Sequence, residues 1–241
     1  MDVDLYIAAP FGNYLHTKET ISVCGTFTIN KRPGLIKQLI KTLRYDFKDK
    51  CWYNALGLRN PGIEYGLKNY REGSVMSIGA LERKHYDFFN ALIPKDIPLE
   101  INISCPNLDH YDVDFEGLPQ FVSRNPILKL TPDITREYME KLLDMGFTRF
   151  HCSNTLKTER GGRSGGILWE YTYNNISYLR HELGAAGYLI AGGGGMRKEH
   201  ITAYREIGAD AVSLGSVCFN PFRLMRVING HVGKRVRLQV Y

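Results

Sequence analysis

A cysteine flanked by hydrogen-bonding side chains follows an apolar run in the middle of the chain. The segment reads Asn102-Ile-Ser-Cys-Pro-Asn107 and comes at the end of the run 97–103. A strand that stops at a proline presents its last side chains at its carboxyl edge, where parallel sheets hold their active sites. An isolated cysteine is usually a small buried hydrophobe. Here a buried amide without a partner would cost about 1 to 3 kcal/mol. The polar neighbours therefore make Cys105 a candidate for chemistry and predict a polar group in front of them.

Two glycine-rich segments follow apolar runs near the end of the chain, at 191–196 and 214–216. Glycines at such strand ends let backbone N–H groups approach an anion, and the next helix adds the positive end of its dipole. One cluster alone would indicate only a tight strand-to-helix turn. Two clusters at successive strand ends predict a phosphate site. No G-x-G-x-x-G motif follows the first expected strand, so a Rossmann dinucleotide site is not supported.

Short β-rich runs alternate with amphipathic segments and would position these residues, a pattern typical of βα units and a parallel sheet. Eight strands in this order favour a closed (β/α)8 TIM barrel, formed by residues 1–241 as one domain. The segment 30–73 shows no regular pattern. Strands are expected at 5–8, 21–28, 75–78, 99–105, 127–130, 149–154, 188–191 and 211–214. Helices are expected at 81–92, after Pro132-Asp133 through Leu143, at 169–182 and at 197–207.

The composition limits the partners. The formal net charge is +6, which would suit a nucleic-acid surface, a phosphate-bearing cofactor or an anionic substrate. The basic residues form no run of the length typical of a nucleic-acid patch, the densest group being Lys31 and Arg32. A solvated basic surface is therefore the favoured interpretation, and no nucleic-acid partner is expected.

The cysteines and the N-terminus indicate the compartment. The five cysteines are far apart and include no C-x-x-C pair, so neither a disulfide framework nor a metal site is expected. The first residues, Met1 to Asp4, carry no basic region, and no apolar run approaches the roughly 20 residues that span a bilayer. We expect a soluble cytoplasmic protein without a membrane partner.

Several motifs, taken in order, resemble the dihydroorotate dehydrogenase family. The segment Asn54 to Asn60 resembles the substrate loop of its soluble, cysteine-base class. The resemblance implies an FMN-binding TIM barrel that oxidises dihydroorotate to orotate in pyrimidine biosynthesis, acting on CH–CH donors. The other motifs are 102–107, Lys129-Leu-Thr-Pro132, Asn154-Thr155, 161–165 and the two glycine clusters.

The resemblance gives Cys105 the role of the catalytic base. In the family mechanism this base removes the C5 proton while a hydride leaves C6 for flavin N5, and class 2 members carry serine there. A thiol with an ordinary pKa near ~8.5 needs only modest tuning for this task. An amide offers the pyrimidine both a donor and an acceptor. The implied substrate-binding residues are Asn54, Gly57, Leu58, Asn102, Asn107, Asn154 and Thr155.

The resemblance also implies the residues around FMN. Lys129 matches the lysine whose charge stabilises the reduced flavin, and it stands inside the apolar run 127–130. The family's active-site lysine would fall at Asn30, so Lys31 reaches the site only if a bulge or a loop intervenes. Pro10 removes a backbone donor near the expected flavin. The implied cofactor-binding residues are Ala8, Ala9, Lys31, Asn102, Lys129, Asn154, Gly165, Gly194, Gly195, Gly215 and Ser216.

Three alternatives remain open at this point. The chain could be an FMN-binding barrel without turnover, or a flavin oxidoreductase acting on a related pyrimidine. A tRNA-dihydrouridine synthase is disfavoured, because such enzymes resemble a Gly-Cys-Pro pattern and carry a further RNA-binding helical domain, for which nothing after Asn229 leaves room. The resemblance suggests a homodimer as well. It does not identify the electron acceptor.

Overall fold

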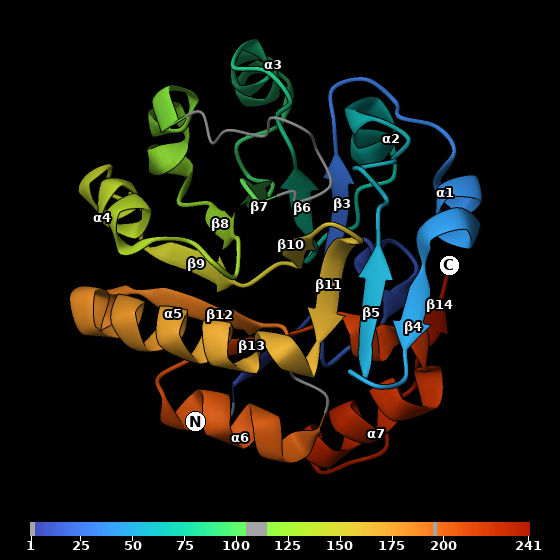
Figure 1. Cartoon of the computed structure of the whole chain (residues 1–241). Helices are drawn as coiled ribbons and strands as arrows, with labels where there is room; N and C mark the ends of the chain where they lie inside the picture. The colour runs from blue at the N-terminus through green and yellow to red at the C-terminus, as the bar shows by residue number, and fades with distance from the viewer. Residues whose placement is uncertain (1–2, 105–114, 195–196) are drawn as a thin grey trace.

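The computed structural model describes residues 3–104, 115–194 and 197–241. Eight parallel strands, all at expected positions, form its central sheet. They are β1 (Asp4–Ile7), β3 (Ile21–Phe27), β6 (Val75–Ile78), β7 (Leu99–Asn102), β8 (Ile127–Leu130), β9 (Arg149–Cys152), β12 (Tyr188–Gly192) and β13 (Ala211–Leu214). They close in the order β1-β13-β12-β9-β8-β7-β6-β3 (Figure 1). The predicted (β/α)8 TIM barrel is confirmed.

Helices surround the barrel, and the expected ones are confirmed with small shifts at their ends (Figure 1). Thr135 caps one of them, because its hydroxyl accepts a hydrogen bond from the backbone N–H of Tyr138 at 3.3 Å. The α-helices are α1 (Leu35–Thr42), α2 (Ile63–Lys68), α3 (Lys84–Leu92), α4 (Arg136–Asp144), α5 (Trp169–Leu183), α6 (Lys198–Glu206) and α7 (Pro221–Val232). Short 3-10 helices are η1 (Phe11–Asn13), η2 (Phe115–Gly117), η3 (Pro119–Arg124), η4 (Gly166–Leu168), η5 (Gly184–Ala186) and η6 (Ser216–Phe219).

A second sheet was not expected. Its four antiparallel strands run in the order β10-β11-β5-β4, and in Figure 1 they lie in front of the barrel strands. Its register pairs Cys51 with Gly165, so segments far apart in sequence become neighbours. The strands are β4 (Arg44–Asp46), β5 (Cys51–Asn54), β10 (Leu156–Thr158) and β11 (Gly161–Gly165). A two-stranded pair joins β2 (Leu15–His16) to β14 (Gln239–Val240).

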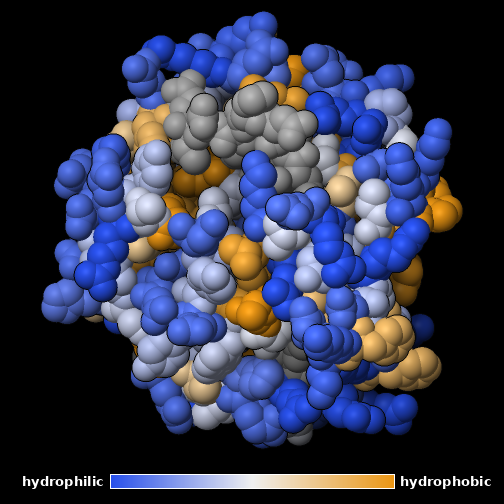
Figure 2. Space-filling model, viewed as in Figure 1, coloured by the Kyte–Doolittle hydropathy of each residue, from blue (hydrophilic) through white to orange (hydrophobic). Residues whose placement is uncertain are grey.

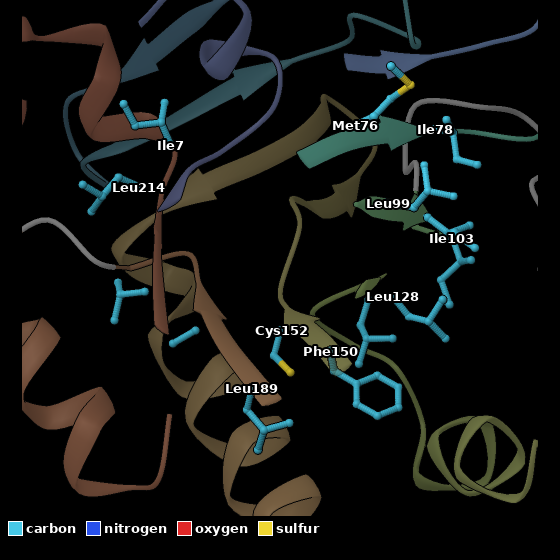
Figure 3. Packing of buried hydrophobic residues seen from close by; sticks show 14 of the residues in the cluster. Ile7, Met76, Ile78, Leu99, Ile103, Leu128, Phe150, Cys152, Leu189 and Leu214 are labelled. Atoms are coloured by element: carbon cyan, nitrogen blue, oxygen red, sulfur yellow. The ribbon is translucent and has the colours of Figure 1, made fainter. Parts of the chain in front are cut away.

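Alternation along the barrel strands separates two kinds of core. Outward side chains such as Leu128 and Phe150 belong to the main hydrophobic cluster, between the barrel and its helices (Figure 3). Inward side chains such as Val75 and Ile127 form a smaller apolar cluster. Further along the same strands the inward positions become polar. The polar layer thus lies between the smaller apolar cluster and the carboxyl ends of the strands. None of the helices in the described ranges combines the length and apolar character needed to cross a membrane.

Candidate active site

A cavity of about 360 Å³ lies at the carboxyl ends of the barrel strands. This volume falls in the range of small-molecule sites. Its wall draws on β7, β8 and β9, on the loops after β1, β12 and β13, and on the second sheet. Predicted site residues in this wall are Ala8, Ala9, Asn54, Gly57, Leu58, Asn102, Lys129, Asn154, Thr155, Gly165, Gly194, Gly215 and Ser216.

Four predicted site residues remain, of which the structure describes one. Lys31 is exposed and does not contribute to the cavity wall. The chain enters a bridge between Arg32 and Asn60 directly after it, so the loop that could have turned Lys31 inward leads it outward instead. The other three, Cys105, Asn107 and Gly195, lie outside the described residues.

The residues just before Cys105 form a fixed hydrogen-bonded frame. The side-chain oxygen Oδ1 of Asn102 accepts from the Ser104 N–H at 3.1 Å and from the Ser104 hydroxyl at 3.0 Å. The Asn154 amide donates to the Ser104 carbonyl at 2.8 Å and to its hydroxyl at 3.1 Å. Asn102 and Ser104 are buried, so the polar partners that their burial demands come largely from this frame. The frame holds the chain in place at the position from which Cys105 continues.

A buried charge cluster that the sequence analysis did not identify lies at the cavity floor. Glu100 is completely buried, and its carboxylate lies 3.8 Å from the Lys129 ammonium and 2.7 Å from Nδ1 of His151. The Ser77 hydroxyl donates to the same carboxylate at 2.8 Å. Lys129 and His151 are themselves 4% and 2% exposed, and both contribute to the cavity wall.

Electrostatics fix the protonation states in this cluster. Burial, the largest single effect, raises the pKa of Glu100, but the Lys129 charge, the His151 charge and hydrogen bond, and the Ser77 hydrogen bond together outweigh it, and the pKa falls from 4.5 to about 2. Burial, followed by the Lys129 charge, lowers the pKa of His151. At neutral pH the carboxylate is therefore ionised and the imidazole is neutral. Because an ionised carboxylate only accepts, Nδ1 of His151 carries the ring proton and donates a hydrogen bond to Glu100.

A chain of hydrogen bonds joins this charge cluster to the Asn102 frame. The Asn102 amide donates to the Thr26 hydroxyl at 3.1 Å, and Thr26 lies 3.0 Å from the Ser77 hydroxyl. Since Ser77 donates to Glu100, the chain ends on the buried carboxylate. The sequence held one signal of this network. Glu100 and Asn102 alternate with apolar Leu99 and Ile101, a spacing of two that turns both polar side chains into the barrel.

Glycines occupy the opposite end of the cavity. The strands β12 and β13, the seventh and eighth of the barrel in chain order, are neighbours, so the two predicted glycine clusters meet at one rim. Gly193 has φ +86°, and an added Cβ would lie 2.7 Å from the Leu168 Cβ, so no larger side chain fits there. A Cβ added at Gly215 would have, among the described residues, only the Ala8 Cβ within reach, at 4.0 Å. The open space beside Gly215 belongs to the cavity.

The cavity's remaining wall is apolar and comes partly from a helix that was not predicted. Leu35 and Leu39 of α1 line it, together with Leu56 from the loop after β5. Phe11 and Phe219 also line it and pack edge to face at 4.9 Å. The ligand space is thus bounded by a polar floor, a glycine rim and an apolar wall.

These features fit FMN. The buried Lys129 supplies a fixed positive charge that would favour an electron-rich ring, and the glycine rim leaves room for a phosphate. The Ser213 hydroxyl is buried at the cavity wall and lacks a hydrogen-bond partner among the described residues. An unpaired buried hydroxyl costs free energy, which a polar edge of a ligand would recover.

Comparisons with known proteins point in the same direction. The catalytic subunit of dihydroorotate dehydrogenase B (NAD(+)) from Oceanobacillus iheyensis is 27% identical over 216 residues, covering 73% of this chain and 70% of that protein. Dihydroorotate dehydrogenase A (fumarate) from Lactiplantibacillus plantarum is 25% identical over 207 residues, covering 70% and 67%. No protein-family model matches the chain.

Solved structures share the fold. Ligand-free DHODH from Eimeria tenella superimposes with a TM-score of 0.73 at 17% identity, covering 94% of this chain and 82% of that one. The same enzyme in complex with ferulenol gives a TM-score of 0.70 at 16% identity. The structural likeness supports the barrel, and the sequence relatives are dihydroorotate dehydrogenases.

Proposed function

We propose that this chain, a member of the dihydroorotate dehydrogenase family, oxidises dihydroorotate to orotate with FMN bound in the cavity. The observation that carries the proposal is the Lys129 ammonium, which is held on the cavity floor by the ionised Glu100. On one side of it lies the Asn102 frame, and at the other end lies the glycine rim. A cation, an amide frame and a glycine rim in one cavity suit a flavin and a small polar substrate.

FMN, when bound, would accept the hydride that leaves C6 of dihydroorotate. Lys129 would stabilise negative charge on the ring, and Glu100 would keep the lysine in position. The backbone around Gly194 and Gly215 would receive the phosphate. Ser213 offers a hydroxyl to the polar ring edge. The apolar wall from Leu35, Leu39 and Leu56 would exclude water from the ring, so that the charge of Lys129 acts with little screening.

The substrate would lie against the amide-lined part of the wall. Asn54, Asn102 and Asn154 offer donors and acceptors suited to a pyrimidine ring and its carboxylate. Cys105 would remove the C5 proton, a role that the family resemblance implies. The Asn102 frame, which also fixes Ser104, would orient the substrate.

Anaerobic flavin reduction tests the proposal. The protein purified with FMN is expected to be yellow and to lose its flavin absorbance when dihydroorotate is added without oxygen. Cys105→Ser should slow this bleaching strongly at neutral pH, because a hydroxyl is a far weaker acid than a thiol. The variant should keep its FMN. The absorbance change after mixing gives the rate of flavin reduction in the wild type and in Cys105→Ser.

A second candidate function is an FMN-binding barrel without turnover. The position of Lys31 outside the cavity wall favours it, because the resemblance assigns an active-site lysine near that position. Yellow protein that dihydroorotate never bleaches would support this alternative and contradict our proposal. Colourless protein that does not take up added FMN would contradict both.

A further inference from the structure

Most of the net charge of the chain lies in one short segment. Residues 31–50 contain seven of the 31 lysines and arginines but only two of the 25 acidic residues. The segment thus carries a net charge of +5, against +6 for the whole chain. Both of its acidic side chains already form ion pairs, Asp46 with Arg160 and Asp49 with Arg163. They are therefore less available to neutralise the lysines around them.

The helix α1, inside this segment, is amphipathic yet buries none of its residues. Its inner side is tethered, because Gln38 donates to the Ala55 carbonyl at 2.7 Å and Thr42 accepts from the Ala55 N–H at 3.0 Å. Ile36 and Ile40 are one helical turn apart and face solvent, with 75% and 70% of their surface exposed. Two aliphatic side chains in solvent on one stripe need a partner more than a single one does.

The lysines of the helix flank this apolar stripe. Lys37 and Lys41 are also one turn apart, each directly after an isoleucine in sequence, and both are exposed. Neither forms an ion pair with any residue in the described ranges. In Figure 2 apolar atoms stand among hydrophilic ones at the right-hand edge, where Figure 1 places α1. A basic stripe beside an apolar stripe is typical of helices that lie in the membrane interface.

The turn after β4 adds an aromatic side chain to the same segment. Phe47 is 84% exposed, the second largest exposed fraction among the large hydrophobic residues of the described part. Tyr45 packs against it edge to face at 5.0 Å, and Trp52 packs against Tyr45 at 4.9 Å. These contacts support the turn that carries Phe47. Lys48 and Lys50 follow it, both exposed.

We propose that residues 31–50 bind the surface of an anionic lipid bilayer, with Ile36, Ile40 and Phe47 inserted among the headgroups and the lysines on the lipid phosphates. Each lysine near such a surface strengthens binding roughly fivefold, which corresponds to about 1 kcal/mol. The sequence predicted a protein without a membrane partner, and this surface argues for the opposite. Because Leu35 and Leu39 of the same helix line the cavity, the bound protein would hold its ligand site next to the lipid.

Charge decides between a bilayer and a second copy of the chain. A symmetric dimer through this face would bring two segments of +5 together, and like charges in an interface oppose association. An anionic bilayer instead attracts the segment along its whole length. The homodimer suggested by the family resemblance stays a prediction. This face is poorly suited to be its interface.

Vesicle flotation with the full-length protein tests the proposal without any need for turnover. The protein should float with vesicles of phosphatidylcholine and phosphatidylglycerol, less so as salt is added, and not with phosphatidylcholine alone. The double variant Ile36→Ser/Ile40→Ser should bind at least about tenfold more weakly, since it removes two inserted side chains. Lys37→Glu/Lys41→Glu should lose at least as much.

Matched controls come from other surfaces of the molecule. Phe222→Ser removes an aromatic side chain on α7 that is 88% exposed, and Lys95→Glu reverses an exposed charge outside the segment. Both controls should bind vesicles like the wild type. All four variants change exposed side chains, so their thermal unfolding should match that of the wild type.

Three results would overturn the proposal. The wild type could fail to float with anionic vesicles, or the control variants could lose as much binding as the α1 variants. In lipid-free buffer, sedimentation velocity could show a dimer that Ile36→Ser/Ile40→Ser splits, which would make this face an interface between copies. None of these results depends on FMN or dihydroorotate, so they leave the proposed activity unaffected.

Discussion

Lys129 lies at a depth where an isolated charge would be strongly destabilising. Its side chain is 5% exposed, and the Glu100 carboxylate 3.8 Å away is fully buried. The carboxylate stays ionised because the Lys129 charge and the bonds from His151 and Ser77 together lower the pKa of Glu100. Such a cluster is a costly way to stabilise a barrel, since well-packed apolar side chains would serve as well. Its position at the cavity floor indicates that it is kept for the ligand.

Removing the Glu100 charge should destabilise the protein. Glu100→Gln leaves Lys129 buried without its counter-ion, and breaking a buried pair in this way costs about 3 to 5 kcal/mol. Denaturant unfolding at neutral pH measures the loss. Glu116→Gln is the control, because Glu116 pairs with Arg83 at the surface, where such a pair contributes about 1 kcal/mol or less. Equal losses in the two variants would contradict a special role for Glu100.

The same carboxyl sets a pH dependence of stability. Its pKa is about 2 in the folded protein against 4.5 as its ordinary value, so the unfolded chain binds its proton first as the pH falls. Stability from this group is therefore complete above about pH 4.5 and is lost as the pH drops toward 2, by about 3 kcal/mol in total. The stability gap between wild type and Glu100→Gln should narrow across this window. A gap that stays constant would show that folding does not shift the pKa of this carboxyl.

At the scale of elements, the glycine rim joins two βα units that are consecutive in the chain and adjacent in the barrel. Chain order was enough to predict this neighbourhood, because the seventh and eighth strands of such a barrel always meet. The alternation of side chains along each strand was likewise enough to predict which of them pack outward against the helices. The second sheet was not predictable in this way. Its strands are three to five residues long, and β5 pairs with β11 about a hundred residues away, beyond the reach of any local pattern.

The rim offers a test that separates ligand binding from folding. Gly215 has a negative φ and open space around it, so Gly215→Ala should fold normally while placing a methyl group in the cavity. Crowding of this kind costs about 1 to 3 kcal/mol, which weakens FMN binding roughly fivefold to more than a hundredfold. Fluorescence titration of FMN measures the change.

Gly166→Ala provides the comparison for that titration. Gly166 also has open space around it, but it lies outside the cavity wall. The Gly166→Ala variant should bind FMN with the affinity of the wild type. Without ligand, both glycine variants should unfold at temperatures close to that of the wild type. Tight FMN binding by Gly215→Ala would place the phosphate elsewhere.

At the scale of the whole molecule, the barrel gathers residues from most of its strand ends into one site, and the sequence anticipated much of that gathering. Lys129 was recognisable because a lysine inside the apolar run of a barrel strand is costly to bury unless a counter-ion or a ligand uses its charge. Glu100 and His151 were missed because each looks unremarkable alone, and only the pairing of β7 and β9 on either side of β8 brings them to Lys129. Lys31 does not line the cavity. Its predicted role depended on the path of a loop, which sequence spacing does not determine.

The central claim is that this barrel converts dihydroorotate to orotate at its cavity. The most direct measurement is an anaerobic single turnover with the FMN-loaded protein, in which the orotate formed is quantified alongside flavin bleaching. We predict one orotate for each flavin reduced, with both signals slowed together in Cys105→Ser. Bleaching without orotate, or no bleaching at all, would contradict the account.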